Sequence, residues 1–415
     1  MASNLRSRLA RIKSLDLNRG GAGLARASEL APPSGTPKVA VSSAHNAKPA
    51  FLKAFSQTGE WLWRRELSYS LALPSGLDPS PYLPLSRRPA CQPGFSSERV
   101  AAERLRVFDL ETTGLSGGAG TLAFLASIGR FEGSNLVVRQ LFLADYPGER
   151  EFVEALLAEF DEGSVALTYN GRSFDMPLLR VRAVMNGLAP PAPAHLDALY
   201  PARRLWKRIY GGASLGLLEK AVLGRERAND VPGSMIPEIF FEFLRRGDHP
   251  VMEIVMSHNA EDVVGLAKLA SRIESVYAKP EAFANPLNLD LRGLGRSLLA
   301  LGRAREGESM LEASFAEGDA ASGYLLCRRY AREGRMLERS AVVERLPGDR
   351  RGFLERAKSA EHGLRRPAEA LAWVVKASSL ARSADETEVD ERRITRLERK
   401  IKRATENESR EEKLG

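Results

Sequence analysis

The stretch VFDLETTGLSGGAGTLAFL, residues 107–125, begins as an apolar strand and then places two acids before a glycine-rich turn. Successive side chains of a strand point to opposite faces, so Asp109 and Glu111 share one face at the strand's C-terminal end. Two neighbouring carboxylates repel each other unless a proton or a cation lies between them. A divalent cation with oxygen ligands meets this need, although an ordinary exposed turn also accommodates Asp-x-Glu.

A second acidic position follows in LTYNGRSFDMPLL, residues 167–179. Here a strand is expected to end near Asn170, and Asp175 falls in the first turn of the next helix. An acid in that turn also complements the helix dipole, so Asp175 alone does not establish a site. The expected strand end nevertheless brings Phe174 and Asp175 to the same edge of the sheet as the first motif.

The third motif is SHNAEDVVGLAKL, residues 257–269. His258 and Asp262 are four residues apart, so a continuous helix stacks them on one face. Val263, Leu266 and Leu269 are expected to anchor this helix in the core. A simple structural His-Asp pair is the alternative interpretation.

The hydrophobic pattern around these motifs predicts a mixed α/β sheet flanked by helices. A strand-like stretch at 59–73 comes first, and the polar positions His195 and Asp197 are expected to be structural hydrogen-bonding groups. The expected strands are 105–110, 121–131, 136–143 and 164–169. The expected helices are 149–160, 174–186, 214–224, 238–247 and 250–274, with a loop at 230–237.

Beyond about residue 285, glycines punctuate a run of helical patterns. Gly302, Gly334 and Gly363 are 32 and then 29 residues apart, close to the tetratricopeptide period of about 34. Generic helical hairpins fit this spacing equally well. The expected domains are a basic disordered arm (1–56), an extended covering segment or linker (57–100), an α/β domain (101–280), TPR-like helical repeats (281–382) and a charged helical tail (383–415).

The formal charge of +8 is concentrated at one end of the chain. The first 100 residues hold 14 Lys or Arg against 6 Asp or Glu, whereas the remainder holds 47 of each sign. Such an arm suits a polyanion through counterion release, but a solvated tail fits equally well. No run of about 18 apolar residues exists, so no membrane span is expected. With Cys91 and Cys327 as the only cysteines, a cytoplasmic protein is the simplest expectation.

The three motifs together resemble those of the DEDD superfamily of 3′–5′ exonucleases, which have a ribonuclease H-like fold. The stretches FDLETTGLSGGAGTLAFLASIGRF, HLDALYPARRLWKR, DVPGSMIPEIFFEFLRRGD and HNAEDVVGL are similar to a bacterial ribonuclease H-like exonuclease family that carries a TPR-like tail. One branch of that family is a mitomycin-damage repair exonuclease. His258 precedes Asp262 by four residues, as in tyrosine-type members, whereas the commonest histidine-type members have an interval of five.

This resemblance implies a two-metal exonuclease that acts on DNA. Two Mg²⁺ or Mn²⁺ ions, about 3.5 to 4 Å apart, would clamp the scissile phosphate. His258 would take the proton of the attacking water. The implied metal ligands are Asp109, Glu111, Asp175 and Asp262, and the implied substrate-binding residues are Thr112, Thr113, Gly114, Leu115, Asn170, Phe174, Arg203 and Arg204.

Two other functions stay open on the sequence alone. An exoribonuclease would use the same acids, because discrimination rests on how the pocket treats a 2′-hydroxyl group. A helical-repeat adaptor with a degenerate nuclease domain is the third possibility, and retention of all four acids and His258 argues against it. The family implies a protein partner such as a helicase for the helical region, while no residue identifies that partner.

Overall fold

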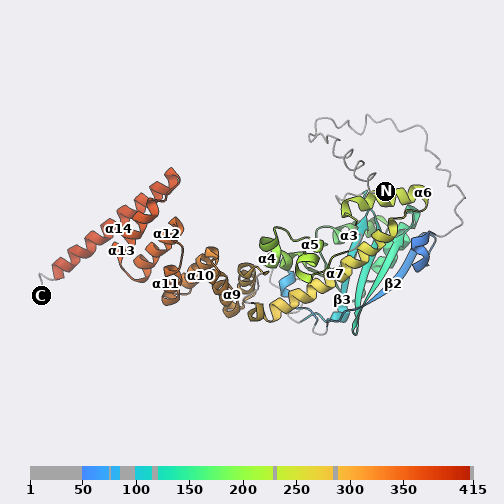
Figure 1. Cartoon of the computed structure of the whole chain (residues 1–415), viewed down its shortest axis with the longest axis horizontal. Coiled ribbons are helices and arrows are strands. Elements are labelled where there is room, and N and C mark those ends of the chain that lie inside the picture. The colour runs from blue at the N-terminus through green and yellow to red at the C-terminus, as the bar shows by residue number, and fades with distance from the viewer. Residues whose placement is uncertain are drawn as a thin grey trace, which may run out of the picture. The chain divides into compact units, whose positions relative to one another are not determined.

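The computed structural model describes residues 49–73, 76–84, 99–114, 120–227, 231–283 and 288–411. Within this part of the chain, seven strands form one mixed sheet in the order β1-β2-β5-β4-β3-β6-β7. Strands β2 and β3 of this sheet are labelled in Figure 1. The strands are β1 (Ser56–Gln57), β2 (Leu62–Ser70), β3 (Leu105–Thr112), β4 (Ala123–Glu132), β5 (Asn135–Leu143), β6 (Val165–Thr168) and β7 (Ala194–Asp197).

The pairing of the strands confirms the predicted mixed sheet. Strands β1, β2, β5, β4 and β3 pair antiparallel in that order, whereas β6 is parallel to β3 and β7 is parallel to β6. The four strands predicted within the α/β region are β3 to β6, and the stretch at 59–73 contains β2. The C-terminal ends of β3, β6 and β7 therefore meet at one edge of the sheet.

Helices cover both faces of this sheet, and the helical predictions at 149–160, 174–186, 214–224, 238–247 and 250–274 each correspond to an observed helix. Among them α7 lies against β3 and β4 (Figure 1). The helices are α2 (Glu149–Leu157), α3 (Asp175–Met185), α4 (Leu199–Tyr210), α5 (Leu215–Leu223), α6 (Ile236–Arg246) and α7 (Met252–Ala278). Short 3₁₀ turns are η1 (Ala50–Ala54), η2 (Ser80–Tyr82), η4 (Ala102–Arg104), η5 (Tyr146–Gly148), η6 (Gly233–Met235) and η7 (Pro280–Phe283).

Strand β3 divides its side chains between two apolar cores. Leu105 and Val107 pack in the core that also contains Val263 of α7. Phe108 and Leu110 belong to the other core, which contains residues of α2, α3 and α6. This alternation sends the odd-numbered side chains of β3 toward α7. Asp109 and Glu111 occupy the next two odd-numbered positions.

Several elements differ from the sequence predictions. Residues 1–48 of the arm expected to be disordered lie outside the described residues, but the end of that arm forms η1 and β1, with Phe51 and Phe55 buried in the core. The predictions contain no strand at β7, which is only four residues long and follows a proline-rich stretch. The stretch expected as a loop at 230–237 holds the turn η6 and the beginning of α6. Pro237 occupies an early position of that helix, where a missing backbone N–H costs nothing.

Residues beyond 288 form helices, as the pattern predicted. Gly302 and Gly334 lie between successive helices with φ of +83° and +71°, a conformation that glycine adopts readily. The helices are α8 (Leu291–Ala300), α9 (Ala304–Ala316), α10 (Ala320–Arg332), α11 (Met336–Glu344), α12 (Arg350–Lys358), the π-helical turn η8 (Ser359–Gly363), α13 (Pro367–Ser378) and α14 (Ala384–Glu411). None of the helices described is long and apolar enough to cross a membrane.

The charged helix α14 is not wholly solvated. Leu397 and Asp390 are fully buried, and Leu397 packs in a small core with Val374 of α13. Asp390 accepts a hydrogen bond from Arg350 at 2.7 Å. The predicted helical tail thus contributes one face to the packing of the helical region.

Candidate active site

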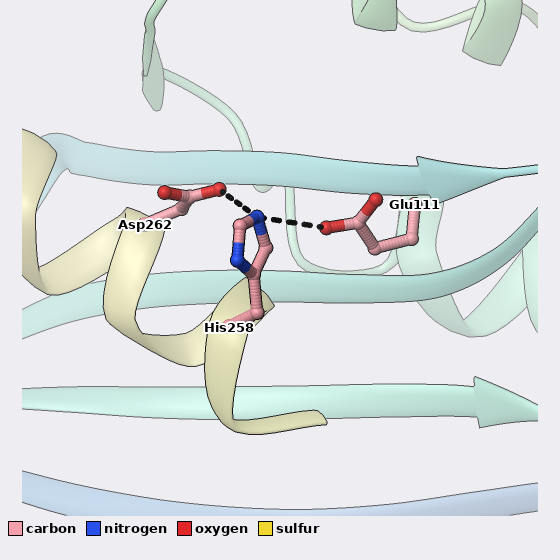
Figure 2. Close-up of side chains that lie close together, drawn as sticks. All are labelled: Glu111, His258 and Asp262. Carbon is pink, nitrogen blue, oxygen red and sulfur yellow. Dashed lines mark ion pairs between the residues drawn. The ribbon is translucent and has the colours of Figure 1, made fainter. Parts of the chain in front are cut away.

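Strand β3 and helix α7 bring the first acids together with the predicted histidine. His258 Nε2 lies 3.3 Å from Asp262 Oδ2 and 3.9 Å from Glu111 Oε1 (Figure 2). Figure 2 shows the imidazole between the two carboxylates, with His258 and Asp262 on successive turns of α7. The three side chains are only 13 to 17% exposed. His258 and Asp262 are therefore stacked one turn apart on α7, as predicted, and both side chains face β3.

Helix α3 supplies the fourth acid, because it begins at Asp175. The chain turns sharply before it, with Asn170 at a φ of +66°. Asp197, at the end of β7, holds this turn by accepting hydrogen bonds from the backbone N–H groups of Asn170 at 2.8 Å and Arg172 at 3.2 Å. Asp197 is thus a structural hydrogen-bonding group, as expected. His195, whose Nε2 lies 2.8 Å from Thr168 Oγ1, is another.

The four predicted acids and His258 line one cavity of about 310 Å³. They come from β3, α3 and α7, which are separated by more than 60 residues along the chain. The full lining comprises Asp109, Leu110, Glu111, Thr112, Gly114, Thr121, Phe174, Asp175, Leu178, Gly233, His258 and Asp262.

Burial and crowding in this cavity raise the pKa of three of the four acids. Burial, together with the charges of Asp262, Asp175 and Glu111, holds the pKa of Asp109 well above its ordinary value. Burial raises the pKa of Glu111 to about 8 and that of Asp175 to about 7, with neighbouring carboxylates adding to both. A bound cation would stabilise the ionised carboxylates and so lower these pKa values, and pKa shifts of this kind are typical of functional sites.

Asp262 behaves differently because it already has a cationic partner. Burial raises its pKa, but the hydrogen bond and charge of His258 and the charge of Arg227 outweigh burial, so the pKa of Asp262 is lowered. The Arg227 guanidinium donates to Asp262 Oδ1 at 2.5 Å. Arg227 also pairs with Glu219, which is only 1% exposed and pairs with Arg225 as well. This Arg–Glu group was not predicted, because no local spacing connects its residues to the acids.

A chain of hydrogen bonds orients Asp109 from behind. Its carboxylate accepts from Asn259 Nδ2 at 2.8 Å, and Asn259 Oδ1 accepts from Ser127 Oγ at 2.6 Å. Ser127 Oγ accepts from Gln140 Nε2 at 2.9 Å, and Gln140 Oε1 accepts from Arg65 Nε at 2.6 Å. All of these bonds run donor to acceptor in one direction, across β2, β5, β4 and α7 to β3. We call this chain of hydrogen bonds the relay. Of its residues other than Asp109, only Asn259 lies in one of the three acidic motifs, within HNAED.

The structure distributes the predicted substrate-binding residues over several places. Thr112 and Gly114 line the acid cavity, and so does Phe174, which is 51% exposed. Thr113 does not line this cavity, and its Oγ1 accepts a hydrogen bond from the Leu122 backbone N–H at 3.0 Å. Leu115 lies outside the described residues, as do Gly117 and Gly118.

Three other predicted residues do not border this cavity. Asn170 contributes its backbone N–H to Asp197, as described above, and is absent from the cavity wall. Arg203 and Arg204 lie on α4 and line a different cavity. Thr121, Leu178 and Gly233 are wall residues that the sequence analysis did not single out.

The donor set fits a divalent metal ion. Glu111, His258 and Asp262 each offer a ligand atom, and these atoms lie within 4.8 Å of one another. Carboxylate oxygens are the ligands that Mg²⁺ and Mn²⁺ prefer. This compact group includes the imidazole, whereas Asp109 and Asp175 contribute from the surrounding wall.

Two comparisons with known proteins bear on this site. Residues 107–274 match a family model described as RNase_H superfamily, and the match begins within β3 and ends within α7. The chain is also 29% identical over 368 residues to the uncharacterized protein YprB of Bacillus subtilis (strain 168), a match that covers 84% of this chain and 88% of that protein. Residues 107–274 therefore form a ribonuclease H-like domain, and the acid cavity lies between its first strand and its last helix.

Proposed function

We propose that this protein is a divalent-metal-dependent 3′–5′ exonuclease that hydrolyses phosphodiester bonds of DNA. The observation that carries the proposal is the convergence of four acids and one imidazole on a single cavity at the edge of a ribonuclease H-like sheet. A carboxylate cluster of this kind is costly in the absence of cations, as the raised pKa values of Asp109 and Glu111 indicate.

Two bound divalent ions would neutralise the charge of the phosphate and of the leaving oxygen. Glu111 and Asp262 would hold one ion, and Asp109 and Asp175 would complete the site. The presence of all four acids in one cavity wall supports this donor set, and the close approach of the Glu111 and Asp262 ligand atoms supports the first ion.

The chain's own residues supply the proton transfer and the positioning. His258 accepts a proton from the attacking water, and the adjacent Asp262 carboxylate stabilises the resulting imidazolium. Water oxygen bonds to phosphorus as the bond to the 3′ oxygen breaks, and that oxygen takes a proton from solvent. The turn at Thr112 and Gly114 lets the backbone approach the terminal nucleotide, and the exposed Phe174 stacks on a base.

A cleavage assay tests this proposal. Purified full-length protein is incubated with Mn²⁺ and 5′-labelled DNA or RNA of the same sequence, as single strands and as duplexes. We expect a ladder of products shortened from the 3′ end, with DNA preferred over RNA. Asp109→Asn should lower the cleavage rate by at least about 100-fold, whereas Glu132→Gln, an exposed acid at the end of β4, should leave it unchanged.

Each alternative function has its own outcome in this assay. Preferential cleavage of RNA would identify an exoribonuclease. Silence on every substrate would favour the helical-repeat adaptor and contradict the nuclease proposal. A role in DNA repair and a helicase as partner of the helical region follow only from the family resemblance and stay part of the proposal.

A further inference from the structure

A second cavity, of about 490 Å³, lies between α4 and α8 and is strongly basic. Residues 101–415 as a whole are balanced, with 47 basic and 47 acidic residues. The concentration of cations here is therefore local. The charged side chains of its wall are Arg203, Arg204, Lys207 and Arg208 of α4, Arg292 and Arg296 of α8, and the single acid Asp290.

The walls of this cavity are fixed by backbone contacts. The Asp290 N–H donates to the Leu205 carbonyl at 2.8 Å. A Cβ atom on Gly293 would lie only 1.9 Å from the Arg204 carbonyl oxygen, so α8 and α4 meet backbone to backbone. The buried Leu294 packs in the same core as Leu205. The cationic side chains thus project from a rigid base.

The cations of this cavity are spaced so that like charges adjoin on each helix. Arg203 and Lys207 are four residues apart on α4, and Arg292 and Arg296 are four residues apart on α8. Like charges at this spacing destabilise a helix. Because Arg204 and Arg208 are also four residues apart, three such pairs line one cavity, which suits a ligand of opposite charge.

Half of the basic side chains are already engaged. Arg204 donates to the Pro81 carbonyl, Arg208 pairs with Asp290 at 2.8 Å, and Arg292 pairs with Asp319 at 3.1 Å. The other three are exposed and form no ion pair within the described part of the chain: Arg203, Lys207 and Arg296. These three charges are available to an anion.

We infer that this cavity binds backbone phosphates of a nucleic-acid strand, at a distance from the acid cavity. Arg203 and Lys207 lie about 6 Å apart along α4, so successive phosphates engage them better than one small anion does. Helix α4 follows β7 directly, and β7 ends at the sheet edge that carries the acid cavity. A strand long enough to span both sites would be held by this second contact, an inference that rests on the proposed function.

Binding of a labelled oligonucleotide tests the inference without turnover. Fluorescence anisotropy of single-stranded DNA is measured with the full-length protein in EDTA over a range of salt concentrations. The cavity variant carries Arg203→Ala, Lys207→Ala and Arg296→Ala together. We expect its affinity to fall at least tenfold at low salt and its salt slope to drop by about 2, since each lost contact to a single strand removes about 0.7.

A matched control variant separates this site from general charge. It carries Lys53→Ala, Arg246→Ala and Arg305→Ala, three exposed cations outside both cavities. The control should bind within twofold of the parent with the same salt slope. The inference is overturned if the cavity variant and the control variant behave alike.

Two further measurements identify the source of the phosphate and isolate the inference from the proposed function. If the cavity variant loses binding of a mononucleotide or of inorganic phosphate but binds the oligonucleotide like the control, the site is for small phosphates and the strand assignment is wrong. If the parent binds DNA through this cavity but cleaves nothing, the inference stands and the nuclease proposal fails. If the parent cleaves DNA and the three substitutions leave affinity unchanged, the inference fails alone.

Discussion

At the scale of single residues, the acids depend on partners that other segments supply. Asn259 is fully buried. It donates a hydrogen bond to the Asp109 carboxylate and accepts one from the Ser127 hydroxyl. Partners of this kind fix the direction in which a ligand side chain points. The orientation of Asp109 therefore depends on side chains of α7 and β4 as well as on β3 itself.

Replacing Asn259 with leucine should weaken both the fold and the site. Asn259→Leu would remove the amide donor of the Asp109 carboxylate and the acceptor of the Ser127 O–H, at a cost of about 1–3 kcal/mol for the buried groups. We expect kcat/KM for DNA cleavage to fall by about 10- to 100-fold. Urea unfolding and single-turnover kinetics measure the two effects. Full activity in the leucine variant would show that the relay does not position Asp109.

His195 gives the protein a defined sensitivity to acid. Burial, and then the charges of Arg172 and Arg180, lowers the pKa of His195 to about 3. The folded protein therefore keeps this imidazole neutral, while the unfolded chain binds a proton below about pH 6.5. Stability is lost as the pH falls from about 6.5 toward 3.

Between pH 7 and pH 5 the loss assigned to His195 is about 2 kcal/mol of unfolding free energy. The variant His195→Gln, which can keep a hydrogen bond to Thr168, should lack this part of the loss. Urea unfolding of both proteins at the two pH values measures the difference. An equal acid-dependent loss in both would contradict the assignment.

At the scale of elements, α7 needs a glycine where it passes α5. A Cβ atom on Gly265 would lie 1.8 Å from Glu219 Oε1, the carboxylate that pairs with Arg225 and Arg227. Because Arg227 also holds Asp262, a shift of Glu219 would reach the acid cavity. The close approach of the two helices therefore connects their packing to the site.

Gly265→Ala should accordingly destabilise the protein, although alanine favours a helix over glycine by about 1 kcal/mol. Gly216→Ala in α5 is the matched control, because a Cβ atom there would meet open space. We expect a lower melting temperature for the first variant and an unchanged or slightly higher one for the second. Equal behaviour of the two would mean that Glu219 moves aside without cost.

The elements that the sequence predicted are those whose pattern is local. Alternation in β3 and the four-residue interval in α7 placed Asp109, Glu111, His258 and Asp262 correctly relative to their own elements. Strand β7 escaped prediction because four residues next to prolines carry too short a pattern, and its parallel pairing to β6 stabilises it. The partners Arg227, Gln140 and Arg65 were equally out of reach, since each comes from a separate segment and no local spacing links it to an acid.

At the scale of the whole described molecule, the α/β region and the first helices beyond it share one core. Leu289, Leu294 and Leu298 pack with Leu205 and Trp206 of α4, and Tyr277 donates to Ser297 at 2.8 Å. The boundary near residue 281 stays a prediction about domains, whereas the packing is continuous across it. This continuity holds α8 against α4, and these two helices form the walls of the basic cavity.

The proposed function requires that acids from β3, α3 and α7 share divalent cations. Titration of Mn²⁺ into the full-length protein, followed by the loss of the free-ion electron paramagnetic resonance signal, measures this without any substrate. We predict that the parent binds Mn²⁺ saturably. In Asp175→Asn the affinity for Mn²⁺ should fall at least about tenfold, the loss that even an outer-shell partner typically causes. In Glu132→Gln the affinity should be unchanged, and circular dichroism should show that both variants are folded. Identical Mn²⁺ isotherms for the parent and Asp175→Asn, or no binding by the parent, would contradict it.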